Sequence, residues 1–280
     1  MTPEETDIVP LVCEVVVWLL LGTGVICGLL LAFRNTLRKG YAPLPAIGVL
    51  RGRPFTFVHA LPVIALTGLF ALMGAFHAAD DGKHVSPTAL ITGMGISAGL
   101  GFFVITLCTA LAGKGFRAVF GSPACTWPAA VGKGFVYGLV AIPVVAVAMQ
   151  AVSEIGEALE LDMSSQEMFT WLGDPSFSIL ARATLIVFAV VVAPVTEELL
   201  FRGILLPALM KSRRFVFAVL LNSFYFSLIH LHGPSLLPLI ILSVMFSAGY
   251  AVTGSILTPI VMHVLFNAAG LLFFFASAGT

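Results

Sequence analysis

The sequence predicts an all-α, polytopic membrane bundle of about eight transmembrane helices, and composition is the first observation behind this prediction. Hydrophobic residues make up 59% of the 280-residue chain and charged residues only 10%, whereas soluble globular proteins average about 45–50% and about 25%. So few charges cannot cover the surface of a water-soluble particle of this size. Composition therefore excludes an ordinary soluble domain, a disordered chain and a basic nucleic-acid-binding protein.

The second observation is a series of apolar runs long enough to cross a bilayer, which takes about 20 mostly apolar residues. An N-terminal unit, residues 1–152, holds the first four runs and shows no recognisable motif. Residues 153–280 hold an outer loop followed by the last four runs. We expect the spans Ile8–Phe33, Phe57–Ala79, Thr88–Ala112, Gly134–Val152, Phe177–Leu200, Phe215–Leu231, Ser235–Gly254 and Leu257–Ala278.

The charges balance at 14 basic and 14 acidic residues, but they separate between alternate loops. Acids fall before the first span, after the second and in the long loop after the fourth. The only basic residue in these three segments is Lys83, which follows the second span. By the positive-inside rule the basic loops are cytoplasmic, so we expect both termini outside the cell membrane and, given the acidic N-terminus, no cleaved signal peptide. The basic loops carry Arg34, Arg38, Lys39, Arg51, Arg53, Lys114, Arg117, Lys133, Lys211, Arg213 and Arg214.

Small residues and cysteines in the spans have structural interpretations. Gly95 and Gly99 in the third span have the spacing that lets neighbouring helices approach closely, with Ser97 and Gly101 offset by two, and we expect them to serve packing. The cysteines are scattered without a CxxC pair, which predicts neither a disulfide framework nor a metal site. They are Cys13, Cys27, Cys108 and Cys125.

Ionisable side chains at membrane depth are costly and are therefore functional candidates. Glu14 and Arg182 lie near the outer ends of their spans, where they can reach the interface. His59 and His77 lie at opposite ends of the second span and are interpreted as interfacial, and His232 as a helix-end residue. The other candidates fall in the last third of the chain as Glu197-Glu198-Leu-Leu-Phe-Arg202, Phe226-Ser-Leu-Ile-His230 and His263-Val-Leu-Phe-Asn267.

The spacing in the first of these pieces separates its two acids. Glu198 and Arg202 are i,i+4 neighbours on one helix face and can pair, which lowers the cost of burying both. Glu197 points about 100° away and is free to face another surface. Pro194 removes a backbone hydrogen bond one turn earlier, so we expect the helix to be bent near the acids.

The other two pieces complete a set of polar side chains at similar depth. Phe226 lies one turn before His230 and can pack beside its ring, and His263 and Asn267 project from one helix face. Glu197 and His230 are equally distant along the chain from the turn between the fifth and sixth spans, so they should meet. His263 joins them only if that turn extends about 12 Å beyond the next one.

A carboxylate and a histidine at one depth can hold a water molecule and take its proton. A second histidine and an asparagine can donate hydrogen bonds to the oxyanion that forms when this water attacks a carbonyl. The set predicts an amide hydrolase without a nucleophilic serine or cysteine, because nearby Ser223 and Ser227 form no nucleophile motif.

The three motifs resemble the CPBP family, which comprises CAAX-processing endopeptidases and bacteriocin-processing or self-immunity (Abi-type) proteins. The family pattern EExxxR, FxxxH and HxxxN occurs here in order as EELLFR, FSLIH and HVLFN, over about residues 190–270. The resemblance implies a glutamic intramembrane protease with no cofactor, acting on a membrane-anchored protein or peptide; the CAAX branch removes a C-terminal tripeptide from a prenylated cysteine. It implies Glu197 as general base, His230 as water-positioning residue, His263 and Asn267 as oxyanion hole, and Glu198 and Arg202 as bracing residues.

Four alternatives stay open. A zinc protease could use the same Glu and His set, although no HExxH motif is present and Asn267 would be idle. A proton-coupled transporter would use Glu197, His230 and His263 as a relay, but the sequence shows no inverted repeat. The chain could be a non-catalytic immunity or partner protein on the same fold, or the polar residues could form a structural network, which leaves Glu197 unpaired. The sequence does not define the oligomeric state.

Overall fold

The structure is a computed structural model, and every regular element in the residues it describes is a helix. Among the described residues, seven helical runs are long and apolar enough to cross a membrane, and an eighth apolar helix is shorter. The predicted polytopic helical bundle is therefore confirmed, and the chain is a multi-pass membrane protein. The described residues are 8–37, 44–79, 86–116, 120–122, 125–161, 163 and 167–277.

The first four predicted spans correspond to single helices, and the fifth is a continuous run of five segments. The single helices are α1 (Ile8–Leu37), α3 (Phe57–Ala79), α4 (Pro87–Leu111) and α6 (Trp127–Ala158), with the short α2 (Ile47–Arg51) and α7 (Glu167–Gly173) in connections. The run consists of α8 (Ile179–Val187), η1 (Phe188–Val192), α9 (Ala193–Glu198), η2 (Leu199–Leu205) and α10 (Leu206–Met210). The remaining elements are α11 (Phe215–Leu228), η3 (Gly233–Ser235), α12 (Leu236–Thr253) and α13 (Leu257–Ser277).

The sixth predicted span is shorter than the sequence indicated. Helix α11 has 14 residues, which extend over about 21 Å and fall short of the roughly 30 Å hydrocarbon core. Leu231 has a positive φ of 51°, and Gly233 and Pro234 follow, so the chain turns where the apolar pattern predicted more helix. His230 therefore lies in a turn at the end of α11 and not inside a helix.

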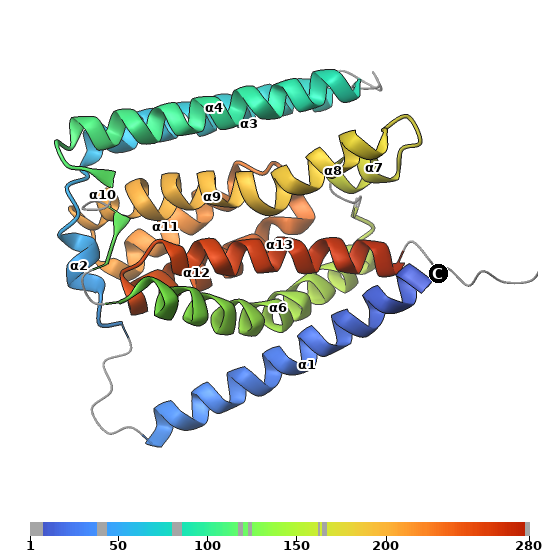
Figure 1. The fold of residues 1–280 in the computed structure, drawn as a ribbon, viewed down its shortest axis with the longest axis horizontal. Helices are drawn as coiled ribbons and strands as arrows, with labels where there is room; N and C mark the ends of the chain where they lie inside the picture. The colour runs from blue at the N-terminus through green and yellow to red at the C-terminus, as the bar shows by residue number, and fades with distance from the viewer. Residues whose placement is uncertain are drawn as a thin grey trace, which may run out of the picture.

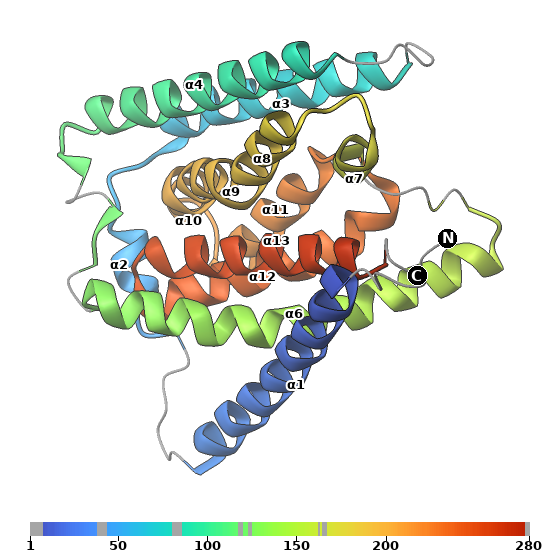
Figure 2. The same ribbon diagram turned by 45° about the vertical axis from the view of Figure 1, so that its right-hand side comes forward.

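The helices form a layered bundle whose two edges are distinct (Figures 1 and 2). Helices α3 and α4 pair along one edge, and α1 crosses obliquely at the opposite edge, where it packs against α6 and α13. The α8–α10 run lies between the α3–α4 pair and α13. The main apolar core joins α3, α4, the α8–α10 run, α11 and α12.

Glycine permits the closest contacts between helices, but these contacts are made by other glycines than Gly95 and Gly99. A Cβ atom on Gly24 of α1 would overlap the Leu139 carbonyl oxygen of α6. A Cβ atom added at Gly95 or Gly99 of α4 would have nothing within 4 Å, so the prediction that they pack against a neighbouring helix within the chain is wrong. Gly101, on the offset face, makes the contact with Thr196 instead.

Four loops predicted to lie on the same side of the membrane meet at one end of the bundle. The buried Arg53 donates from Nη2 to the carbonyl oxygens of Gly121, at 2.6 Å, and Gly254, at 2.9 Å. Lys211 donates from Nζ to the Arg51 carbonyl oxygen at 2.7 Å. Which side of the membrane this end faces stays a prediction. Several charges used for it lie outside the described residues, namely Glu4, Glu5, Asp7, Arg38, Lys39, Asp80, Asp81, Lys83, Arg117 and Asp162.

Candidate active site

Two π-helical segments, η1 and η2, flank α9, which carries the paired acids. The Ala193 N–H donates to the Phe188 carbonyl oxygen, and Pro194 has no N–H to give to the next carbonyl in the same pattern. The carbonyl oxygen of Ala189 therefore has no partner within its own helix, and Nδ2 of Asn267 donates to it at 2.8 Å. This hydrogen bond attaches α13 to the α8–α10 run, and the bend expected at Pro194 stays a prediction.

The predicted pair of Glu198 and Arg202 is confirmed and is completely buried. Nη1 of Arg202 donates to Oε1 of Glu198 at 2.8 Å, and both side chains are 0% exposed. Nη2 of Arg202 also donates to Oγ of Ser243 at 2.6 Å. The guanidinium lies over the rings of Phe226 and Phe246, with centroid distances of 4.6 and 5.2 Å. Hydrogen bonds, an opposite charge and two aromatic faces together stabilise this buried cation.

His263 connects the buried pair to Glu197. Its Nδ1 atom lies 2.9 Å from Oε1 of Glu198, and because a carboxylate oxygen accepts, Nδ1 is the donor. Its Nε2 atom lies 3.9 Å from Oε2 of Glu197. The ring also packs against Phe246, with centroids 4.9 Å apart. Glu198 thus fixes both the tautomer and the orientation of this imidazole, the role that a carboxylate commonly has beside a functional histidine.

The formal charge of this cluster depends on His263. Glu197, Glu198 and Arg202 together carry one net negative charge, and a protonated His263 brings the sum to zero. One carboxylate lies near each nitrogen of the imidazole ring. When both ring nitrogens carry a proton, Nε2 is a hydrogen-bond donor as well as Nδ1.

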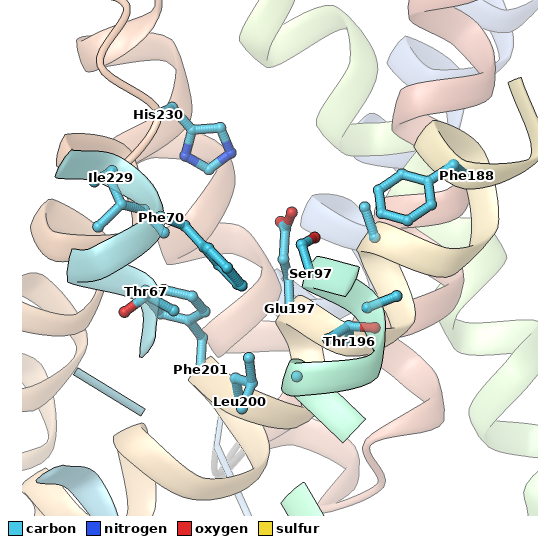
Figure 3. Close-up of a pocket in the computed structure, with 14 residues that line it drawn as sticks. Thr67, Phe70, Ser97, Phe188, Thr196, Glu197, Leu200, Phe201, Ile229 and His230 are labelled. Atoms are coloured by element: carbon cyan, nitrogen blue, oxygen red, sulfur yellow. The ribbon is translucent and has the colours of Figure 1, made fainter. Parts of the chain in front are cut away.

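Glu197 and His230 line one cavity of about 240 Å³, as the sequence predicted from their equal depth. Glu197 extends into it from α9, with 27% of its side chain exposed, and His230 faces it from the end of α11 (Figure 3). Nδ1 of His230 lies 2.7 Å from the Phe226 carbonyl oxygen, which can only accept, so Nδ1 carries the proton. The neutral ring then presents a lone pair on Nε2.

The structure brings six of the seven predicted site residues into one connected group. The centroid of the Phe226 ring lies 4.8 Å from that of His230 and 6.1 Å from that of His263, and the Arg202 guanidinium covers the same ring. Asn267 lies outside this group, because its side chain donates to the Ala189 carbonyl oxygen; like His263, it is not among the residues that line the cavity. One of its two amide protons is engaged there, and the other is available.

Sequence reasoning missed two kinds of residue. Ser243 and Phe246 of α12 hold Arg202 and His263, and the only sequence signal was a serine inside an apolar span. The second group forms the cavity wall contributed by α3 and α4, and its side chains are apolar, small or hydroxyl-bearing, as in most membrane helices. These wall residues are Thr67, Phe70, Ala71, Ser97, Ala98 and Gly101.

The placement of possible ligands bears on metal binding. No group of three or more His, Cys, Asp or Glu side chains in the described part of the chain is arranged to hold a metal ion. The Nδ1 atoms of His230 and His263 are both engaged in hydrogen bonds, which leaves one nitrogen on each ring.

Comparison with known proteins gives matches to the C-terminal part of the chain. Residues 179–269 match the family model described as type II CAAX prenyl endopeptidase Rce1-like. The putative membrane peptidase YdiL of Bacillus subtilis is 34% identical over 83 residues, which cover 30% of this chain and 34% of that protein. The similarity therefore spans about a third of the relative's length. No solved structure matches the chain significantly.

Proposed function

Residues 179–269 belong to the CPBP family of CAAX-type membrane endopeptidases and their relatives, and on this basis we propose that the chain is an intramembrane endopeptidase. It hydrolyses a peptide bond of a membrane-anchored protein or peptide with a water molecule activated by Glu197 and His230. The observation that carries the proposal is that these two side chains face one cavity, while Glu198, Arg202 and His263 are hydrogen-bonded to one another behind it.

The hydrogen-bond partners of the two acids support Glu197 as the general base. Glu198 accepts hydrogen bonds from Arg202 and His263 and is fully buried. Glu197 accepts none from any residue in the described part of the chain and has a partly exposed carboxylate. A base must be free to take a proton from its water, and of the two acids only Glu197 meets that condition.

His230 complements Glu197 in holding the water. Its Nδ1 proton is donated to the Phe226 carbonyl oxygen, so Nε2 accepts one hydrogen of the water while Glu197 accepts the other. The water's oxygen then directs a lone pair at the substrate carbonyl. As the C–O bond forms, one proton passes to Glu197, which later delivers it to the leaving nitrogen when the C–N bond breaks.

His263 and Asn267 are the proposed donors to the oxyanion. Glu198 holds Nδ1 of His263 and so directs the opposite nitrogen of the ring toward Glu197. In the imidazolium form this Nε2–H can donate to the negative oxygen of the tetrahedral intermediate. Asn267 keeps one amide proton beyond its bond to Ala189, and this proton is its proposed contribution.

The function is tested by identifying membrane proteins that depend on the chain for cleavage. Cells producing the wild-type chain, Glu197→Ala or Glu154→Ala are compared by membrane proteomics, with Glu154 chosen because it is an exposed glutamate far along α6. We expect the same set of uncleaved proteins to accumulate with Glu197→Ala and with deletion of the chain, but not with Glu154→Ala. Identical proteomes for Glu197→Ala and wild type would contradict a protease function.

A chelator separates the zinc alternative from the proposed mechanism. Purified chain in lipid vesicles should cleave a substrate from that set equally well before and after treatment with a strong chelator. Activity that disappears with the chelator and returns with zinc would assign the same Glu and His residues to a metal site.

A further inference from the structure

Three residues with a side-chain hydroxyl line the cavity, and they differ in how that hydroxyl is used. Oγ1 of Thr67 donates to the Val63 carbonyl oxygen at 2.8 Å. Oγ1 of Thr196 donates to the Val192 carbonyl oxygen, also at 2.8 Å. Oγ of Ser97 makes no hydrogen bond with any residue in the described part of the chain. Ser97 is therefore the lining residue whose hydroxyl proton stays available.

Ser97 also does not use its hydroxyl within its own helix, α4. Serine and threonine in a helix can donate to the carbonyl oxygen four residues earlier, as Thr106 of α4 does to Phe102 at 2.8 Å. The Ser97 hydroxyl is instead directed to the same side of the cavity as the Glu197 carboxylate (Figure 3). A hydroxyl that the helix backbone does not occupy can bind a molecule in the cavity.

The other side chains of the cavity that keep hydrogen-bonding capacity are acceptors. As a carboxylate, Glu197 can only accept. Neutral His230 presents the lone pair of Nε2, because its Nδ1 proton is donated to the Phe226 carbonyl oxygen. The backbone N–H of His230 is also engaged, by the Ser227 carbonyl oxygen at 3.2 Å. Among the described residues that line the cavity, the free side-chain donor is thus the hydroxyl of Ser97.

A peptide bound for cleavage brings carbonyl groups that need such a donor. In a helix each carbonyl oxygen accepts from the N–H four residues later, so the segment around the scissile bond must unwind before water can attack. The released carbonyl oxygens lose their partners beside mostly apolar lining residues. Glu197 and His230 cannot donate to them, and His263 and Asn267 are assigned to the oxyanion of the scissile carbonyl itself.

Building on the protease function above, we propose that Ser97 is a substrate-binding residue, which donates its hydroxyl proton to a main-chain carbonyl oxygen flanking the scissile bond. The hydrogen bond holds the unwound segment against α4, with the scissile carbonyl toward Glu197 and its water. The close contact of Gly101 with Thr196, one turn later in α4, fixes the distance of Ser97 from Glu197. Ser97 lies outside residues 179–269, so this contact comes from the part of the chain that the family match does not cover.

The first test measures cleavage of a synthetic membrane-anchored reporter peptide in lipid vesicles by wild type, Ser97→Ala and Thr106→Ala. Thr106→Ala is the matched control, because it also removes a hydroxyl from α4 but at a residue that does not line the cavity. Loss of one hydrogen bond to the substrate should lower kcat/KM of Ser97→Ala about three- to tenfold, mainly through a higher KM, with Tm unchanged. A kcat/KM of Ser97→Ala equal to that of the control overturns the proposal.

A second test separates contact with the substrate from a structural role of Ser97. Carbonyl groups flanking the mapped cleavage site are replaced one at a time by thioamides, which keep the N–H but have sulfur, a weaker hydrogen-bond acceptor than oxygen. At the position that Ser97 binds, the thioamide should lower kcat/KM severalfold with wild type and little with Ser97→Ala. Equal decreases with both proteins at every position overturn the proposal. A reporter that is cleaved equally by wild type and Glu197→Ala would instead contradict the protease function itself.

Discussion

Nδ1 of His263 donates to Oε1 of Glu198 at 2.9 Å. Glu198, which does not face the cavity, thereby orients the imidazole beside Glu197, which does. The two adjacent glutamates thus have separate tasks. Glu198 is shared between Arg202 and His263 inside the bundle, and Glu197 stays available to the cavity. This division follows from the rotation of about 100° between neighbouring helical residues.

Loss of the Glu198 carboxylate should destabilise the fold as well as the site. Glu198→Ala leaves Arg202 as an uncompensated buried charge, and removing one partner of such a pair costs about 3–5 kcal/mol. We expect a clear drop in the Tm of the purified chain in detergent, while the exposed control Glu157→Ala leaves Tm unchanged. A Glu198→Ala variant with the same Tm as the control would show that the Glu198–Arg202 pair does not stabilise the fold.

Removing both charges should be less harmful than removing one. In Glu198→Ala/Arg202→Ala neither charge remains buried, so its Tm is expected to lie above that of at least one single variant. A thermal-denaturation cycle of the four proteins measures the coupling, which we expect to be about 1–3 kcal/mol. Strictly additive effects would contradict a direct interaction.

The stabilisation that Asn267 provides should depend on the presence of Pro194. Asn267→Ala leaves the partly buried Ala189 carbonyl oxygen without its side-chain donor, at a cost of about 1 kcal/mol. Pro194→Ala restores a backbone N–H near this carbonyl, so we expect Asn267→Ala to lower Tm less in that background than in wild type. An equal decrease in both backgrounds would show that the missing proline N–H is not what Asn267 replaces.

The contact between α4 and α9 should be sensitive to one methyl group. Gly101→Ala introduces a Cβ atom 2.5 Å from Thr196, next to Glu197, and must separate the two helices. We expect cleavage to fall at least severalfold. Gly99→Ala is the matched control in the same helix, because nothing lies within 4 Å of its added Cβ. Similar activity of both variants would show that this contact does not position the site.

The sequence singles out the polar residues of the candidate site because each of them is costly in an apolar helix. Glu197, Glu198 and Arg202 stand out for that reason, and their helical spacing indicated which acid is paired and which is free. The fold class followed similarly from apolar runs of membrane length. The predicted span Phe57–Ala79 is identical to α3, whereas α6 and the α8–α10 run extend beyond the predicted fourth and fifth spans and α11 is shorter than the sixth.

The remaining features depend on contacts between segments distant in the chain. Which glycine of α4 meets α9 is decided by helix rotation, which an apolar helix surrounded by lipid does not reveal in its residue pattern. Ser243 and Phe246 look like ordinary residues of a membrane helix until Arg202 and His263 are placed beside them. The early end of α11 likewise depends on the turn at Leu231, whose side chain is apolar.

The most direct test of the account is the cleavage rate of purified chain in lipid vesicles with Glu197 replaced by its neutral isostere. Glu197→Gln keeps the size of the side chain but cannot take a proton from water, and general-base catalysis contributes roughly 10²–10⁴-fold. We predict kcat to fall by about that factor, with Tm and KM near the wild-type values and with Glu154→Gln as the exposed control. Glu197→Gln that cleaves at the wild-type rate would contradict the account.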